Sequence, residues 1–112
     1  VPFAIKRIYY IHDVPAGVQR GGHAHKNLRQ VLWCPYGKIL IKLDDGFEKA
    51  EVLLDSADKG LIVESNMWRD MLWQQDNSVL CVAADSFYDA ADYIRDYEEF
   101  LRHVGAQASV KE

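Results

Sequence analysis

The chain has 112 residues, a formal net charge of −4 and 49% hydrophobic residues, which fits one globular domain with a modest core. The excess of acidic residues argues against a general nucleic-acid-binding protein, and the sequence has no apolar run near the roughly 20 residues of a membrane-spanning helix and no signal-peptide pattern. We therefore expect a cytoplasmic domain that has neither a nucleic acid nor a membrane as its partner.

Short strands separated by turns account for most of the chain. Pro35-Tyr-Gly37 predicts a turn and Asp44-Asp45-Gly46 predicts a hairpin between β-branched and aromatic runs. Turns about eight to twelve residues apart are typical of an all-β sandwich or barrel. The two cysteines, Cys34 and Cys81, lie in apolar runs and are predicted to be buried free thiols. The predicted strands cover residues 4–11, 30–34, 38–43, 49–54, 60–63, 68–73 and 79–83.

The last segment changes to a helical period. Asp89 and Asp92 suit the start of a helix, and Gly105 suits its end. We expect this helix to pack on the outside of the barrel, giving a single domain over residues 1–105 and a flexible tail over residues 106–112. The apolar residues that share one helix face are Tyr93, Ile94, Tyr97, Phe100, Leu101 and Val104.

The most informative motif is Arg20-Gly-Gly-His23-Ala-His25-Lys26, followed by Gln30 and Gly37. Two histidines separated by one residue on a strand lie on the same face of the sheet. The spacing of these histidines from Gln30 and Gly37 resembles the first cupin motif. The fold class that follows is all-β, a cupin double-stranded β-helix (jelly roll) with a C-terminal α-helix.

Two roles compete for the histidine pair. In metal-binding cupins, two histidines, a glutamate and a later histidine hold a divalent ion. Here the glutamate position is Gln30, and Arg69 stands where the later histidine would be sought, since His103 is the only histidine after His25. Arginine stays charged and does not bind a metal. We therefore interpret the site as free of metal and cofactor, with His23 and His25 as general acid and base near neutral pH.

Cations near the histidines indicate an anionic ligand. Arg20 and Lys26 flank the histidine turn, and Arg69 lies between Trp68 and Asp70 at a barrel position. A guanidinium can form paired contacts with a diphosphate. Arg7 and Tyr9 share one face of the first strand and are also candidates for binding substrate.

Several short sequence runs along the chain resemble one protein family when they are taken together, although no single run is specific. They are Val1-Pro-Phe-Ala-Ile-Lys-Arg-Ile-Tyr-Tyr-Ile11, Arg20-Gly-Gly-His-Ala-His-Lys26, Gln30-Val-Leu32, Leu43-Asp-Asp-Gly46, Gly60-Leu-Ile-Val63, Trp68-Arg-Asp-Met71, Asp85-Ser-Phe-Tyr-Asp89 and Ala91-Asp-Tyr-Ile-Arg-Asp-Tyr97. Together they resemble the WxcM-like cupins, which are nucleotide-sugar 3,4-ketoisomerases, over residues 2–102.

This resemblance implies a metal-independent isomerase of deoxysugar and polysaccharide biosynthesis, usually a homodimer. Its substrate would be a dTDP-linked 4-keto-6-deoxysugar whose carbonyl moves from C4 to C3 through an enediol. By resemblance, His25 would be the base at C3, His23 would assist proton transfer, and Arg20 would bind the diphosphate.

Two departures from the family pattern matter. Family chains usually carry an earlier segment with an Asp-Arg-Gly stretch that lines the site and can cross to the partner subunit, so we expect this chain to lack an N-terminal segment. Many members also have Trp-His-Glu-Met where this chain has Trp68-Arg-Asp-Met71. Losing that imidazole predicts protonation of C4 from the other face and a gluco rather than galacto product.

Three alternatives remain open from the sequence. A sugar-nucleotide epimerase also needs a base that removes a proton from carbon. A non-catalytic cupin would bind a sugar nucleotide without turning it over, although both histidines are retained. A metal-dependent oxygenase would need bound iron.

Overall fold

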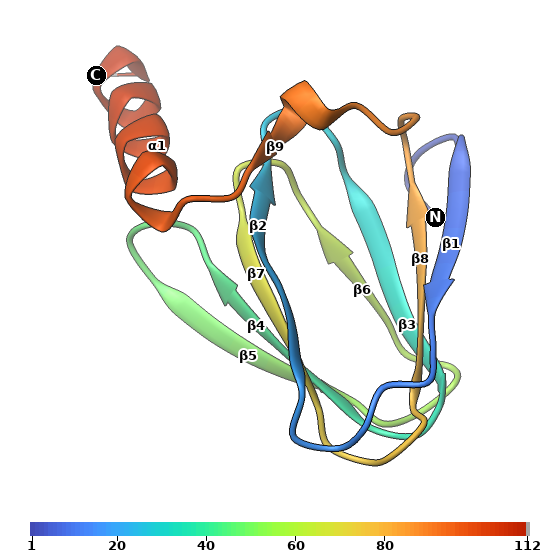
Figure 1. The fold of residues 1–112 in the computed structure, drawn as a ribbon. Helices are drawn as coiled ribbons and strands as arrows, with labels where there is room; N and C mark the ends of the chain where they lie inside the picture. The colour runs from blue at the N-terminus through green and yellow to red at the C-terminus, as the bar shows by residue number, and fades with distance from the viewer. Residues whose placement is uncertain (112) are drawn as a thin grey trace.

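Residues 1–111 of this chain are described by a computed structural model, with side chains described through residue 106. Within this range the strands form two antiparallel sheets that face each other (Figure 1). The four-stranded sheet has the order β1 (Arg7–Ile11), β8 (Val79–Ala84), β3 (Gln30–Tyr36) and β6 (Gly60–Val63). The five-stranded sheet has the order β5 (Lys49–Leu54), β4 (Ile39–Asp44), β7 (Trp68–Trp73), β2 (Gln19–His25) and β9 (Tyr93–Ile94). The predicted jelly roll is confirmed.

Alternation along the strands fills the space between the two sheets. On β7, Arg69, Met71 and Trp73 are buried while the residues between them are not, as expected for a strand with one inward face. The indole N–H of Trp73 donates to the Ser78 carbonyl at 2.8 Å. Trp73 is thus a fully buried member of the apolar core between the sheets. The remaining buried members of this core are Val14, Leu32, Cys34, Ile39, Ile41, Leu54, Val63, Leu80 and Val82.

A β-bulge in β2 sets the direction of the site residues. The register of β2 on β7 shifts between Gly21 and His23, so Arg20 and His23 share the inner face although they are three residues apart. Gly21 has φ +95°, and a Cβ there would lie 2.8 Å from the Arg69 carbonyl oxygen. Glycine is therefore required for both the backbone conformation and the close approach of β7.

The C-terminal segment corrects the predicted helix at both ends. Tyr93 and Ile94 form the short strand β9, which pairs with Ala24 and His25 of β2. A 3₁₀ turn (Ala90–Asp92), capped by Asp89, precedes it. Helix α1 (Tyr97–Lys111) begins later than predicted and passes Gly105. The spacing of Tyr93, Ile94 and Tyr97 is compatible with one continuous helix and also with a strand followed by a helix. The pairing of Tyr93 and Ile94 with β2 favours the strand.

The first half of α1 packs on the outer side of the five-stranded sheet (Figure 1). Phe100 and Val104 form a second buried cluster with Ala24 and Ile94. The helix backbone extends into the segment predicted as a flexible tail, whose last residue, Glu112, lies outside the described residues. The flexibility of that segment stays a prediction.

Candidate active site

One end of the barrel brings together side chains from the two facing sheets, which form its two walls. One wall carries Arg7 and Tyr9 on β1 and Gln30 on β3, and both Arg7 and Gln30 pair with Ala84 of β8. The opposite wall carries the two histidines of β2, with His23 paired to Arg69 of β7. Residues paired in neighbouring strands project from the same face. Both walls therefore present polar side chains to the upper interior.

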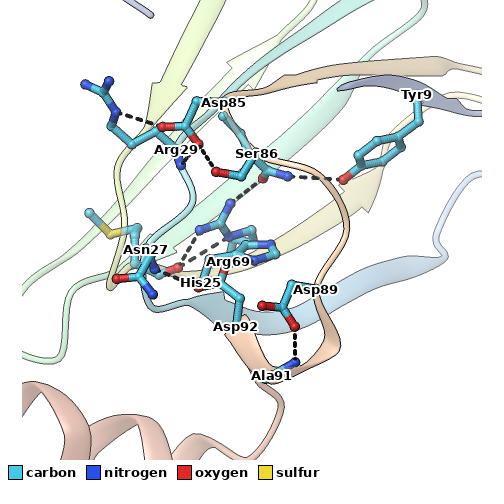
Figure 2. A network of polar contacts seen from close by, with 12 residues as sticks. Tyr9, His25, Asn27, Arg29, Arg69, Asp85, Ser86, Asp89, Ala91 and Asp92 are labelled. Carbon is cyan, nitrogen blue, oxygen red and sulfur yellow. Dashed lines mark hydrogen bonds and ion pairs between the residues drawn. The ribbon is translucent and has the colours of Figure 1, made fainter. Parts of the chain in front are cut away.

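Arg69 bridges the two walls. Its Nη1 donates to Gln30 Oε1 at 2.5 Å, and its Nε and Nη2 donate to the Met67 carbonyl at 3.3 and 3.0 Å (Figure 2). Burial lowers the pKa of Arg69 to about 10, which still leaves the guanidinium charged at neutral pH. The site thus contains a fixed positive charge whose hydrogen-bond acceptors are neutral amide and carbonyl oxygens rather than a carboxylate.

The same network reaches the hydroxyl of Tyr9. Gln30 Nε2 donates to Tyr9 Oη at 3.3 Å. Because the Tyr9 oxygen accepts this bond, its own proton remains available for donation to another group. Burial raises the pKa of Tyr9, so the phenol stays protonated at neutral pH. Tyr9 is therefore a proton donor on the wall opposite the histidines.

The two imidazoles lie next to each other and are uncharged at neutral pH. Their ring centroids are 5.1 Å apart and the rings are nearly perpendicular. Burial, assisted by the positive charge of Arg69, lowers the pKa of both His23 and His25 from 6.5 to about 4. Each can therefore accept a proton when a negative charge develops nearby.

Asp92 fixes the orientation of His25. The Asp92 carboxylate oxygens lie 3.0 Å from His25 Nδ1 and 2.8 Å from the backbone N of Asn27, which donates to it (Figure 2). The Asp92 carbonyl also accepts the backbone N–H of Lys26 at 2.9 Å. A carboxylate at Nδ1 favours a proton there, so the lone pair of His25 lies on Nε2. Among residues 1–106, His25 Nε2 is buried without a hydrogen-bond partner.

The histidines differ in access to the opening. His25 is 0% exposed, whereas His23 is half-buried. Tyr93 of β9 covers the pair, with its ring centroid 5.2 Å from that of His23 and 4.3 Å from that of His25. Arg95 lies over the Tyr93 ring at 4.2 Å. A ligand that enters the barrel therefore meets His23 before His25.

The predicted cations occupy different positions. The Arg7 guanidinium stacks on Tyr9 and Tyr88 at 5.1 and 5.7 Å, and its buried Nε and Nη2 find no partner in the described part of the chain. Arg20 is exposed on the inner face beside the bulge. Lys26 is half-buried and joins the site through its backbone bond to Asp92. Unsatisfied buried N–H groups are costly, so Arg7 is prepared for an anionic ligand.

Sequence reasoning missed Asp92 and Tyr93 as site residues because it assigned both to a helix. The hydrogen bond between Asp92 and His25 joins positions 67 residues apart, and no local sequence pattern predicts it. It also missed Asn66, whose backbone N–H donates to the His25 carbonyl at 2.6 Å. Asn66 has φ +61°, a conformation that asparagine tolerates better than most residues.

Two further findings concern ligands and membranes. Over the described residues, no group of three or more histidine, cysteine, aspartate or glutamate side chains is arranged to hold a metal ion. Two of the positions expected to bind metal in other cupins, Gln30 and Arg69, are hydrogen-bonded to each other. None of the helical structure described is long and apolar enough to span a membrane.

Comparison with known proteins gives consistent matches over nearly the whole chain. Residues 1–105 match the model of the family described as FdtA, WxcM-like, C-terminal. The TDP-4-oxo-6-deoxy-alpha-D-glucose-3,4-oxoisomerase of Aneurinibacillus thermoaerophilus is 43% identical over 104 residues, which cover 93% of this chain and 75% of that protein.

Two solved structures share the fold closely. A 3,4-ketoisomerase from Helicobacter canadensis is 46% identical and superposes with a TM-score of 0.91, covering 94% of this chain and 79% of its own. The TDP-quinovose 3,4-ketoisomerase WlaRB from Campylobacter jejuni is 50% identical, with a TM-score of 0.87 over 91% of this chain and 78% of its own.

Proposed function

Since the chain belongs to the WxcM-like family of sugar-nucleotide 3,4-ketoisomerases, we propose that it converts TDP-4-keto-6-deoxyglucose into a TDP-3-keto-6-deoxyhexose. The observation that carries the proposal is the placement of two uncharged imidazoles and a protonated phenol on facing sheets, joined through the buried guanidinium of Arg69 and Gln30. Moving a carbonyl along a sugar requires a base, an acid and stabilisation of a developing oxyanion, and this site supplies all three.

Substrate binding uses the cationic side chains near the histidines. The nucleotide diphosphate lies against Arg20 at the bulge and Arg7 on β1, whose unpartnered Nε and Nη2 can form a paired contact with it. Lys26 adds positive charge to this side of the site. Gln30 and Tyr9 then face the sugar from the wall opposite the histidines. This orientation directs the ketose between the histidines and Tyr9.

The reaction is a balanced transfer of one proton from C3 to C4. The base removes the C3 proton, and the electron pair of the C–H bond forms a C3–C4 double bond while the C4 carbonyl becomes an enolate oxygen. A proton moves from the C3 hydroxyl to the C4 oxygen, C4 takes up a proton, and the C3 carbonyl forms. The fixed charge of Arg69 stabilises the enolate. That negative charge in turn raises the basicity of the imidazoles.

His23 is the imidazole that we place against the substrate. The resemblance implied His25 as the base, but His25 has no exposed surface and a base must reach the proton that it removes. His23 is half-buried and faces the opening. His25, oriented by Asp92, stands edge-on behind it and supports its orientation. The roles expected for the two histidines are thereby exchanged in this proposal.

Proton exchange in D₂O tests the function and the base together. NMR of TDP-4-keto-6-deoxyglucose incubated with the protein should show deuterium entering at C3 of the 4-keto substrate and at C4 of a 3-keto species as that species appears. His23→Asn should abolish exchange and His25→Asn should reduce it. His12→Asn should leave it unchanged, because His12 lies on the surface beside Asp13. Exchange with inversion but no carbonyl migration would indicate an epimerase, binding without exchange would indicate a non-catalytic cupin, and loss only in His25→Asn would restore that residue as the base.

Arg69 directs the configuration of the product. A buried guanidinium held by Gln30 and Met67 occupies the place of a possible imidazole donor, so C4 is protonated from the opposite wall and the product has the gluco configuration. The relative from Campylobacter jejuni that is 50% identical carries quinovose, a gluco sugar, in its name. The coupling constant between the protons on C4 and C5 of the product, measured by NMR, distinguishes the two configurations, because it is large for the gluco and small for the galacto arrangement, and a galacto product would contradict this assignment.

The functional unit that we propose is a homodimer formed through the four-stranded sheet. The outer face of this sheet has two rows of aligned positions without a charged residue. Ile8 and Tyr10 are each 63% exposed there, which is unusual for a lone domain. In a chain of net charge −4, an uncharged face lets a second copy approach without repulsion. The rows are Ile8, Ala83, Val31 and Ile62, and Tyr10, Cys81, Trp33 and Gly60.

Sedimentation equilibrium tests the dimer. Tyr10→Lys should shift the protein to a monomer, because it buries a charge in a face-to-face contact of two sheets. Phe47→Lys is the matched control, since Phe47 is 70% exposed but lies in the β4–β5 loop. A monomeric wild-type protein, or a Tyr10→Lys variant that stays dimeric, would overturn the proposal.

A further inference from the structure

The end of β2 that carries both imidazoles is held by the helix outside the barrel. His103 of α1 places its Nε2 2.8 Å from Asn66 Oδ1. The backbone N–H of Asn66 donates to the carbonyl oxygen of His25 at 2.6 Å. Two hydrogen bonds therefore connect a helix side chain to the backbone of a site histidine, through a residue that lies between β6 and β7.

Packing reinforces this connection from the same side. Ala24, the residue between the two site histidines, is 0% exposed and is buried with Phe100 and Val104 of the helix. Trp68, the neighbour of Arg69 on β7, packs against Phe100 with ring centroids 5.7 Å apart. β2 and β7, which supply the imidazoles and Arg69 to the interior, thus each have an adjacent, outward residue packed against α1.

We infer that α1 is a positioning element for the imidazole pair and that His103, acting through Asn66, is a positioning residue for the proposed isomerase reaction. The inference rests on the proposed function for its kinetic consequence. His103 lies on the outer side of the sheet and acts through the position of the His25 backbone. Asp92 holds the ring of His25 while Asn66 holds its carbonyl, so loss of the outer bond lets the strand end shift and alters the contact between the ring and Asp92.

His103→Leu tests the inference because it keeps the packing volume and removes the hydrogen bond. We expect kcat to fall about tenfold, the scale of a small displacement of a catalytic group, while KM and the affinity for TDP stay unchanged. His103→Gln places an amide nitrogen near the position of Nε2 and should recover most of kcat. Arg102→Ala, an exposed position on the same helix, is the matched control and should behave as the wild type.

A second measurement does not depend on catalysis. In protein with ¹⁵N-labelled histidine, the Nδ1 and Nε2 shifts of His25 report the tautomer and the Asp92 contact. His103→Leu should move these resonances, whereas His103→Gln and Arg102→Ala should not. Unmoved resonances in His103→Leu, or a fall in kcat that His103→Gln fails to recover, would overturn the inference. A wild-type protein without isomerase activity would contradict the proposed function, while the NMR result would still decide whether His103 positions His25.

Discussion

At the scale of single residues, the carboxylate of Asp92 decides which nitrogen of His25 carries the proton. Asp92→Asn can still accept the Asn27 N–H, but its amide can present a donor to Nδ1 and favour the wrong tautomer. We expect kcat to fall about 10²-fold, the scale for a misplaced catalytic group, because His25 orients His23, with little change in the unfolding temperature. Asp89→Asn, which alters the cap of the same 3₁₀ turn, is the control; equal losses in both variants would reduce the role of Asp92 to local folding.

A second prediction for a single residue concerns Tyr9, which serves as the proton donor in the proposed reaction. Tyr9→Phe removes the hydroxyl that accepts from Gln30 and leaves one amide N–H unpaired, at a cost of about 1–3 kcal/mol. Deuterium exchange at C3 should continue at a reduced rate, whereas formation of the 3-keto product should fall about 10²-fold. NMR that follows both positions in one reaction separates these effects. A normal rate of product formation would exclude Tyr9 as the donor.

Part of the site could be predicted from residue patterns in the sequence. The sequence predicted that His23, His25, Gln30 and Arg69 would face one interior, and the structure brings them together. These positions could be predicted because strand alternation is a local property. The position of Asp92 could not be predicted, because its contact with His25 depends on the return of the segment after β8 to β2.

At the scale of elements, the bulge of β2 is the feature on which the site depends most. Gly21→Ala meets both a positive φ and a backbone oxygen at 2.8 Å, whereas Gly17→Ala meets a positive φ with nothing within 4 Å. The conformation alone costs about 1–2 kcal/mol, so Gly21→Ala should lose clearly more stability than Gly17→Ala in urea unfolding, and should also lose activity. Equal losses would mean that β7 moves aside without penalty.

The strands themselves were predictable to different degrees. Residues 49–54, 60–63 and 68–73 were predicted with the bounds that the structure has, because turn residues bracket each of them. The first strand begins at Arg7 rather than at residue 4, since β-branched composition alone does not mark where pairing with β8 starts. β9 is two residues long and exists through its pairing with β2, which no periodicity within the segment encodes.

At the scale of the whole molecule, the buried imidazoles link stability to pH. Burial lowers the pKa of His23 and His25 from 6.5 to about 4, so between these values the unfolded chain binds more protons than the folded one. The free energy of unfolding should therefore fall as pH drops from 6.5 towards 4, by about 1.4 kcal/mol per pH unit for each proton of difference. Urea midpoints at pH 7.5 and pH 5 measure this, and a His23→Asn/His25→Asn double variant should show a shallower dependence. An unchanged slope in that variant would assign the effect to other groups.

The distance along the chain between His25 and Asp92 has a consequence for biosynthesis. All of the strands from β1 to β8 precede Asp92, and domains begin to fold from the N-terminus while the ribosome is still adding residues. A nascent chain that has just completed β8 can close its barrel around the core, yet its imidazole pair has neither the carboxylate nor the helix that fix it. The barrel is thus able to form before it is able to catalyse, and competence arrives only with the segment that begins at Asp92.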